Sequence, residues 1–312
     1  MRKELGILIL LVLLCTLVAV LNPQFLSSAN IQNTSRLIGI YGIFSIGVGI
    51  VIVTGGIDLS VGSMFALLGV LLSLMLTDWD WNPLVAVSAV VVLGAMMGAG
   101  HGVLITRLRL QPFLVTLCGL LLYRGLARYI AADVVQGFGA GSGFEWLRDF
   151  TTGSLGPVPM PFVLLLVVAA VMWVLLHRSV YGRYLVAVGQ NEDAARYAGV
   201  NTGLVITSAY VVSGLLAAIA AVLLAFYTNS VSPSSHGNFY ELYAIAAAVL
   251  GGCSLRGGEG SVLGIVAGTA LLQVLRNLVN LLDIPSSLDF AVMGAVILIG
   301  VIADQVLRRP QK

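Results

Sequence analysis

The chain has 312 residues, of which 59% are hydrophobic and only 10% are charged, and its mean hydropathy is +1.01. Soluble globular proteins carry about 25% charged residues, so this composition excludes a soluble fold and indicates an integral membrane protein. The net charge of +2 does not indicate a nucleic-acid partner, because the basic residues are spread thinly between apolar segments. No soluble domain fits between these segments, and we expect a single transmembrane domain over residues 1–312.

Ten segments have the apolar character of membrane-spanning helices, for which about 20 residues cross the hydrocarbon core. The first follows Met1-Arg2-Lys3 and resembles a signal peptide, but an apolar run of 17 residues is long for one. We therefore expect it to remain as a span. The eighth is short and predicts a partial or broken helix inside the bundle. The expected spans are Leu5–Leu21, Leu37–Val53, Val61–Leu76, Leu84–Ile105, Pro112–Ala131, Phe162–Leu176, Val205–Thr228, Tyr240–Gly251, Val262–Leu282 and Phe290–Ile302.

The distribution of Lys and Arg predicts the orientation, because these residues are enriched in cytoplasmic connections. With a cytoplasmic N-terminus and ten alternating spans, 11 of the 16 basic residues lie on the cytoplasmic side. One span more or fewer would place the Arg178–Arg196 cluster or the basic C-terminal tail outside. We expect an all-α polytopic membrane protein with about ten transmembrane helices, both termini cytoplasmic, and some helices short or broken.

The stretch Thr54–Ser63 reads Thr-Gly-Gly-Ile-Asp-Leu-Ser-Val-Gly-Ser and interrupts two apolar runs that carry no charge. A carboxylate there lies at the membrane surface or faces a polar cavity inside the protein. Glycines such as Gly56 allow the backbone to turn sharply or to approach another group closely. Asp58 could act as the N-cap of the third span, which we favour slightly, or contact a transported solute. Ser60 would solvate the same break.

A weak echo of this stretch occurs later in the chain, where Gly251–Leu255 resembles Gly55–Ser60 and is also followed by Gly-Ser and an apolar span. This could be a repeated helix break, as in transporters that are built from discontinuous helices. It could equally be chance among 36 glycines.

The one sizeable cytoplasmic loop, residues 177–202, predicts a short capped helix at its centre. Asn191 can cap its N-terminus, and Glu192 and Asp193 place negative charge at the positive end of the helix dipole. Arg196 falls near its end, and Gly199 stops it in the C′ position. From these residues alone, a docking helix for a partner and a solvated connector are equally supported.

Several kinds of chemistry are missing from the sequence. Lys occurs only at positions 3 and 312, so there is no internal Gly-x-x-x-x-Gly-Lys phosphate loop. The three histidines are isolated and form no His-Glu-x-x-His motif, and there is no Gly-x-Ser-x-Gly elbow. We expect no catalytic residue, no bound metal and no cofactor. Only Asp58 and Glu241 qualify as candidates for intramembrane carboxylates, and both lie close to predicted span ends, which disfavours self-powered, ion-coupled transport.

Five stretches together resemble the permease subunits of bacterial ABC importers for monosaccharides, the group that includes the ribose, xylose and arabinose permeases. The resemblance covers nearly the whole chain, and the Gly-Ile-Asp-Leu-Ser-Val-Gly-Ser run is its most specific part. Tyr243 and Cys253 depart from the family, which usually has Asp and commonly Thr there. Because Tyr243 replaces the Asp of the family, any role of that Asp in binding a ligand or pairing helices is in question for this chain. The five stretches are Thr54–Ser63, Leu121–Gly125, Gly189–Asn201, Tyr240–Gly252 with Gly257–Gly260, and Asn277–Asn280.

The resemblance implies a multi-pass protein of the bacterial inner membrane that works in a complex. Two permease chains, identical or sister copies, would form the channel, a pair of cytoplasmic ATP-binding subunits would hydrolyse ATP, and an extracytoplasmic binding protein would deliver the sugar. The helix over Asn191–Gly199 would then be the coupling helix that docks on the ATPase. A ribose-like pentose is the favoured substrate. Gly56, Asp58, Ser60, Asn277 and Asn280 are candidates for the substrate pathway or for helix breaks.

Two other functional classes remain as alternatives. A secondary carrier or facilitator for a small polar solute would act alone, without ATPase or binding protein. A signalling or scaffolding role is disfavoured, because no soluble domain is predicted.

Overall fold

The computed structural model describes residues 2–139 and 143–285, together with residues 288, 291, 294, 295 and 298. Helices dominate this part of the chain, which confirms the all-helical class. The strands among these residues are two residues long and form two antiparallel pairs. These are β1 (Gln136–Gly137) with β4 (Ser230–Val231), and β2 (Ser154–Leu155) with β3 (Val158–Pro159).

Nine of the ten predicted spans fall in the described residues, and each corresponds to an apolar helix. Six of these helices are long and apolar enough to cross a membrane, and three are shorter. The second helix begins at Ser28, well before the expected Leu37. Most of the tenth predicted span, Phe290–Ile302, and the basic C-terminal tail lie outside the described residues. The nine helices are α1 (Arg2–Leu21), α2 (Ser28–Val53), α3 (Val61–Thr77), α4 (Pro83–Arg107), α5 (Pro112–Ile130), α7 (Met160–Trp173), α10 (Thr202–Thr228), α11 (Tyr240–Leu250) and α12 (Val262–Leu281).

Shorter helices lie in the connections. A 3₁₀ turn, η1 (Pro23–Leu26), links α1 to α2, and a π-helical turn, η2 (Val174–Arg178), continues α7. The predicted capped helix is α9 (Glu192–Tyr197). Two further helices, α6 (Glu145–Thr152) and α8 (Val180–Gln190), were not expected from the sequence.

Helices α2 and α10 form the centre of the bundle, and their side chains are buried along most of their length. Helix α10 packs against α4 and α2, while α2 also packs against α7, α11 and α12. The α4–α10 contact is close because glycines face it: a Cβ atom at Gly98 would overlap the Tyr210 carbonyl, and one at Gly214 would overlap the Gly94 carbonyl. Small residues at such an interface allow two membrane helices to approach closely.

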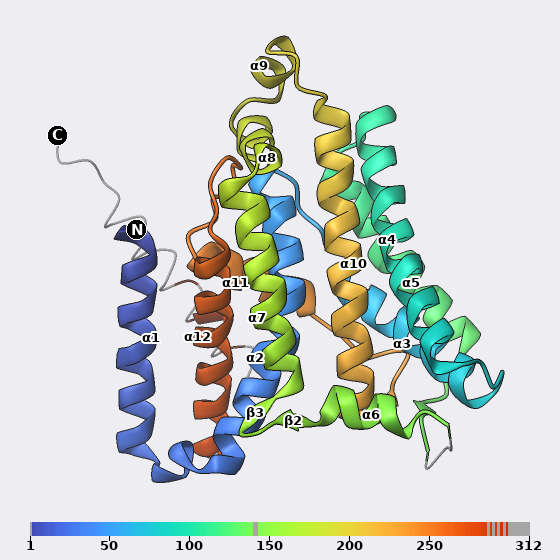
Figure 1. Ribbon diagram of the computed structural model, residues 1–312, viewed down its shortest axis with the longest axis vertical. Coiled ribbons are helices and arrows are strands. Elements are labelled where there is room, and N and C mark those ends of the chain that lie inside the picture. Colours follow the sequence, from blue (N-terminus) through green and yellow to red (C-terminus); the bar gives the residue numbers. More distant parts are fainter. Residues whose placement is uncertain are drawn as a thin grey trace.

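The bundle has two distinct ends (Figure 1). Helices α8 and α9 lie at one end, and α6 with β2 and β3 lies at the other; we call these the α9 end and the α6 end. Helix α1, at the edge of the bundle beside α12, begins toward the α9 end and finishes toward the α6 end. The N-terminus and the α8–α9 connection therefore face the same way, as the basic residues predicted.

Two of the short helices begin inside the bundle. Near the start of α3, Gly62 packs so closely against Gly237 and Glu241, around the start of α11, that a Cβ atom would overlap both. From this meeting point α3 runs to the α6 end, where Ser73 donates a hydrogen bond to the Gly137 carbonyl (3.1 Å). Helix α11 runs the other way and ends in a loop that contacts the end of α2. The prediction that the eighth span is a partial helix inside the bundle is confirmed.

Candidate functional site

The connection between α2 and α3, residues 54–60, leaves the helical path and enters the bundle. The N–H groups of Thr54 and Gly55 donate to the carbonyls of Val51 and Ile52, which closes the end of α2. Gly55 has a φ of +83°, a conformation that glycine adopts without strain. The chain then continues without regular secondary structure to Ser60, and α3 starts at Val61.

Asp58 lies deep in the protein, with 1% of its surface exposed. Its Oδ1 accepts hydrogen bonds from the Ser60 N–H (3.0 Å) and from Ser60 Oγ (2.7 Å), and its Oδ2 accepts one from Ser213 Oγ (3.0 Å). Ser213 lies 11 residues after Thr202, the first residue of α10, or about 17 Å along that helix. The carboxylate is therefore well inside the bundle, and of the two placements open from the sequence, the membrane surface is wrong.

The prediction that Asp58 is the N-cap residue of the third span is also wrong. Ser60 is the N-cap residue of α3, and Asp58 precedes it by two residues. Ser60 has helical backbone angles and its side chain makes no capping bond, because its hydroxyl donates to Asp58 instead. Asp58 therefore stabilises the non-helical segment and its junction with α3, while Ser213 ties it to a different helix.

The backbone of the break is satisfied by neighbouring helices. The Ile57 carbonyl accepts hydrogen bonds from Thr116 Oγ1 on α5 (3.1 Å) and from the Tyr210 hydroxyl on α10 (3.4 Å). Non-helical backbone at membrane depth is tolerated where protein or water supplies its partners. Gly56 is close to the same tyrosine, since a Cβ atom there would lie 2.6 Å from the Tyr210 hydroxyl.

A histidine completes this polar cluster. His101, on α4, is buried, and its Nε2 lies 2.9 Å from the Tyr123 hydroxyl on α5. A Cβ atom at Gly119 would lie 2.6 Å from His101 Nε2 and 3.2 Å from Ser60 Cβ, which shows how near the histidine and the break are. In the sequence His101 is only an isolated histidine; the structure places it beside the break.

The second carboxylate, Glu241, lies where the two interrupted helices meet. Its Oε2 packs against Gly62 at the start of α3, so a side chain at Gly62 would displace it. A carboxylate at helix N-termini is stabilised by the unpaired N–H groups and the positive end of the dipole. Sequence reasoning noted Glu241 but gave it no role; the shortness of α11 and the preceding Gly237 were the available signals.

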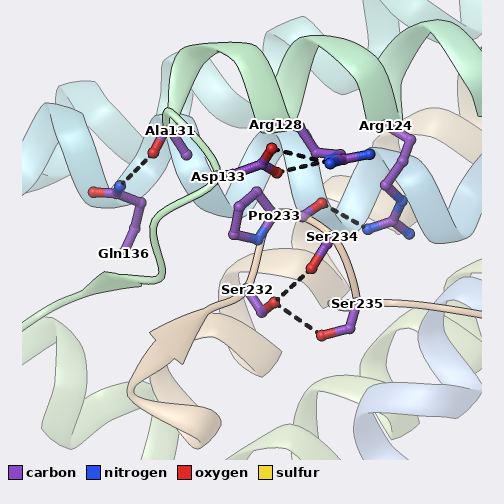
Figure 2. Close-up of polar contacts among 9 residues, drawn as sticks. All are labelled: Arg124, Arg128, Ala131, Asp133, Gln136, Ser232, Pro233, Ser234 and Ser235. Carbon is purple, nitrogen blue, oxygen red and sulfur yellow. Dashed lines mark hydrogen bonds and ion pairs between the residues drawn. The ribbon is translucent and has the colours of Figure 1, made fainter.

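Arg124 on α5 anchors the connection before α11. Its guanidinium donates to the carbonyls of Pro233 (3.1 Å) and His236 (2.8 Å) and reaches the Gly62 carbonyl (3.4 Å). Figure 2 shows Arg124 pointing toward Pro233. Arg128, one turn further along α5, instead pairs with Asp133, which follows the end of the same helix. Arg124 therefore ties α5 to the connection before α11 and to the start of α3.

A cavity of about 670 Å³ opens at the α9 end and reaches the break. Gly56 and Tyr210 line it, and so do Glu192 and Arg196 of α9. The structure thus brings one predicted pathway residue and two predicted coupling residues to the same space. Arg109, in the α4–α5 connection, also lines this cavity and was missed by sequence reasoning.

Helix α9 is capped as predicted. Asn191 Oδ1 accepts the Ala194 N–H (2.9 Å), and Gly199 follows the helix with a φ of +84°. Glu192 accepts hydrogen bonds from Arg196 and from Thr202 Oγ1 (3.1 Å) at the start of α10. Asp193 is exposed. Tyr197, which the sequence did not single out, is 93% exposed at the end of α9.

The two glycine-rich loops of the predicted echo contact each other. The Gly258 N–H donates to the Val53 carbonyl at the end of α2 (2.8 Å), and Gly257 packs against Gly55 and Gly189. The helices after the two loops begin in different surroundings. Helix α3 starts inside the bundle, whereas Gly264, in the first turn of α12, packs against Gly251 at the end of α11.

Asn277 and Asn280 lie away from the break, toward the α6 end of α12. Asn277 and Asn30 pair through their side-chain amides, with N–O distances of 2.7 and 3.0 Å. Asn280 is exposed and lines a separate cavity of about 310 Å³ with Asn277. The five pathway candidates therefore divide between two places.

Comparisons with known proteins agree with this architecture. Residues 30–301 match the family model described as branched-chain amino acid transport system / permease component. The chain is 38% identical to the ribose import permease protein RbsC of Bacillus subtilis over 97% of this chain and 93% of that protein. It is also 38% identical to RbsC of Escherichia coli K12, over 95% of this chain and 92% of that protein. To the D-allose transport system permease protein AlsC of the same strain it is 31% identical, over 97% of this chain and 92% of that protein.

No solved structure matches the chain. The family match covers most of the sequence, and the relatives extend over nearly the whole of it. The chain therefore belongs to the branched-chain amino acid and sugar permease family of bacterial ABC importers, as a multi-pass inner-membrane component that is not itself the catalytic subunit.

Proposed function

We propose that this chain forms the membrane pathway of an ATP-driven importer for a monosaccharide, with a ribose-like pentose as the favoured substrate. Ribose and allose appear in the names of relatives that match over more than nine tenths of the chain. A second copy or a sister permease would complete the pathway, a pair of ATP-binding subunits would drive it, and an extracytoplasmic binding protein would deliver the sugar.

The observation that carries the proposal is the continuous path from α9 to the buried break. Glu192 and Arg196 line the same cavity as Gly56, and α10, which follows α9 directly, holds Asp58 through Ser213. Thr202 at the start of α10 also donates a hydrogen bond to Glu192 of α9, so we expect a displacement of α9 to move α10 and, through it, the break. In this mechanism ATP binding closes the ATPase pair and opens the pathway outward, and hydrolysis resets it inward.

The α9 end faces the cytoplasm in this proposal, and both termini lie on that side. Helix α9 is the docking surface for the ATPase because it combines acidic side chains at its N-terminus with the exposed ring of Tyr197. Aromatic side chains that fill a pocket on a partner are frequent hot spots of interfaces. Asp58 and Ser60 hold the break at the edge of the pathway, and contact of Asp58 with the passing sugar is the second role we assign to it.

The docking role is tested by two sets of variants in the reconstituted complex. Glu192→Ala with Asp193→Ala should reduce sugar-stimulated ATP hydrolysis, and unchanged coupling would refute the assignment. Tyr197→Ala should reduce co-purification of the ATPase with the permease by about tenfold or more, the loss typical of a hot-spot aromatic. Tyr129→Ala is the matched control, because Tyr129 on α5 is 84% exposed but lies far from α9.

The alternative of a carrier that acts alone is tested with the purified chain in liposomes. Our proposal predicts no sugar uptake without the ATPase and the binding protein. Uptake by the chain alone would support the carrier and contradict the importer.

A further inference from the structure

We propose that the cavity at the α6 end, between α2, α10, α11 and α12, is a weak binding site for a neutral polyhydroxylated solute inside a single permease chain. This inference rests on the proposed function and adds a location to it. The cavity has a volume of about 310 Å³, at the lower limit of the range typical of small-molecule sites. A monosaccharide is a solute of the appropriate size.

The lining of the cavity has the mixed chemistry that a sugar requires. Carboxamides of Asn33, Gln273, Asn277 and Asn280 supply both hydrogen-bond donors and acceptors. No Asp, Glu or Lys lines the cavity among the residues that the structure describes. A ligand with many hydroxyl groups and no charge satisfies such a surface, because each hydroxyl can donate and accept.

A buried carbonyl in this cavity lacks a partner. Gln273 is only 4% exposed, and its Oε1 accepts no hydrogen bond within the described chain. Thr34 on α2 also lines the cavity, and its hydroxyl is buried and has no partner within the described chain. Unsatisfied buried polar groups are rare and costly, and each calls for an explanation. Hydroxyl groups of a bound solute would supply the missing partners of both.

Aromatic rings also line the cavity. Tyr41 and Tyr240 line it with ring centres 4.8 Å apart, and their faces can cover the C–H surface of a sugar ring. Arg276 is already engaged: it donates to the Tyr41 hydroxyl (3.0 Å), and its guanidinium lies 5.7 Å from the centre of the Tyr243 ring. This arrangement positions the tyrosines, and it favours a neutral ligand over a phosphate group as the occupant.

The position of the cavity gives it a role. It opens near the end opposite α9, which faces the binding protein in the proposed orientation. Tyr240 is the first residue of α11, the helix whose start packs against α3. A solute in this cavity would therefore contact one of the two interrupted helices without contacting Asp58.

The test is saturation-transfer NMR on the permease in nanodiscs, using whichever of D-ribose, D-xylose, L-arabinose and D-allose the complete importer transports best. Wild-type protein should transfer saturation to the sugar, and Gln273→Met should weaken binding by about fivefold or more, as expected for the loss of one hydrogen bond. Thr269→Val is the control, one turn away on α12, where the buried hydroxyl bonds to the Ile265 carbonyl; it should bind as wild type.

A purely structural Gln273 would behave differently. Met has similar length and no unsatisfied carbonyl, so Gln273→Met should leave thermal stability unchanged or higher. Equal sugar binding by wild type and Gln273→Met overturns the site, as does displacement of the signal by glycerol 3-phosphate, which would assign the cavity to a lipid headgroup. Transport of none of the four sugars by the complete importer would instead contradict the proposed function.

Discussion

Ser213 Oγ donates a 3.0 Å hydrogen bond to Asp58 Oδ2, and this bond joins the helix that follows α9 to the interrupted segment before α3. Both residues are almost fully buried. A hydrogen bond to a charged group inside a protein is worth more than a neutral one, and losing it leaves the charge with one partner fewer. Together with the hydrogen bond from the Tyr210 hydroxyl to the Ile57 carbonyl, this bond links α10 to the break.

Replacing Ser213 with Ala should therefore lower the stability of the protein by about 1–3 kcal/mol, the cost of leaving Asp58 Oδ2 unpartnered. It should also reduce transport more than it reduces ATPase binding. Thermal unfolding in detergent and uptake by the reconstituted importer measure the two effects. Ser208→Ala is the control on the same helix, because Ser208 bonds to the neutral Val205 carbonyl and to Tyr181. Equal effects of the two substitutions would contradict a special role of the Asp58 pair.

Asp58 itself should tolerate loss of charge poorly. Asp58→Asn keeps the size but turns one acceptor into a donor that faces Ser60 or Ser213, and Asp58→Ala removes all three acceptor contacts. We expect the unfolding temperature to fall in the order wild type, Asn, Ala. The loss of a buried network typically costs a few kcal/mol. If Asn is as stable as wild type yet fails to transport, Asp58 acts on the substrate rather than on the break.

The meeting point of α3 and α11 can be tested through its glycine. At Gly62 a Cβ atom would overlap Glu241 Oε2 and the Gly237 carbonyl, whereas at Gly125 in α5 no atom lies within 4 Å of the added Cβ. Gly62→Ala should reduce the amount of folded protein and its unfolding temperature. Gly125→Ala should be neutral or stabilising by up to about 1 kcal/mol, because Ala is the better helix former. Gel-filtration yield and thermal unfolding compare the two, and equal behaviour would refute the close contact.

The amide pair between Asn30 and Asn277 should show coupling in a double-mutant cycle. Either residue replaced by Leu leaves the other amide without its partner, at a cost of about 1–3 kcal/mol. With both replaced, the pair becomes apolar and the loss should be smaller than the sum of the single losses. Additive losses in the free energy of unfolding would show that the two side chains are independent.

Tyr243 takes part in a cation–π contact. The Arg276 guanidinium lies over its ring, an arrangement worth about 0.5–2 kcal/mol. Tyr243→Phe should keep most of the contribution that this contact makes to stability, and Tyr243→Leu should lose that contribution. Thermal unfolding measures both. Tyr243→Asp offers the guanidinium a carboxylate in place of the ring and should be less destabilising than Leu. Equal stability of the Leu and Phe variants would rule out a stabilising contact.

The sequence alone determined the membrane class, the nine spans that fall in the described residues and the capped helix at α9, because these depend on local hydrophobicity and on capping residues within a few positions. Asn191 and Gly199 act on the short helix that lies directly between them. It also identified Asp58 and Glu241 as the unusual carboxylates. Burial depth could not be read in this way, because it depends on which helices surround a segment.

Only the tertiary structure decided what the carboxylates do. Asp58 is placed inside the bundle by Ser213, 155 positions away in the chain, and Glu241 packs against Gly62 from a helix that runs in the opposite direction. The way in which whole helices pack determines which residues Asp58 and Glu241 contact. This packing depends in turn on the shape of α2, α4 and α10 and on their glycine contacts. A local pattern predicts that a helix breaks; the helices that pack around the break determine what its charged groups contact.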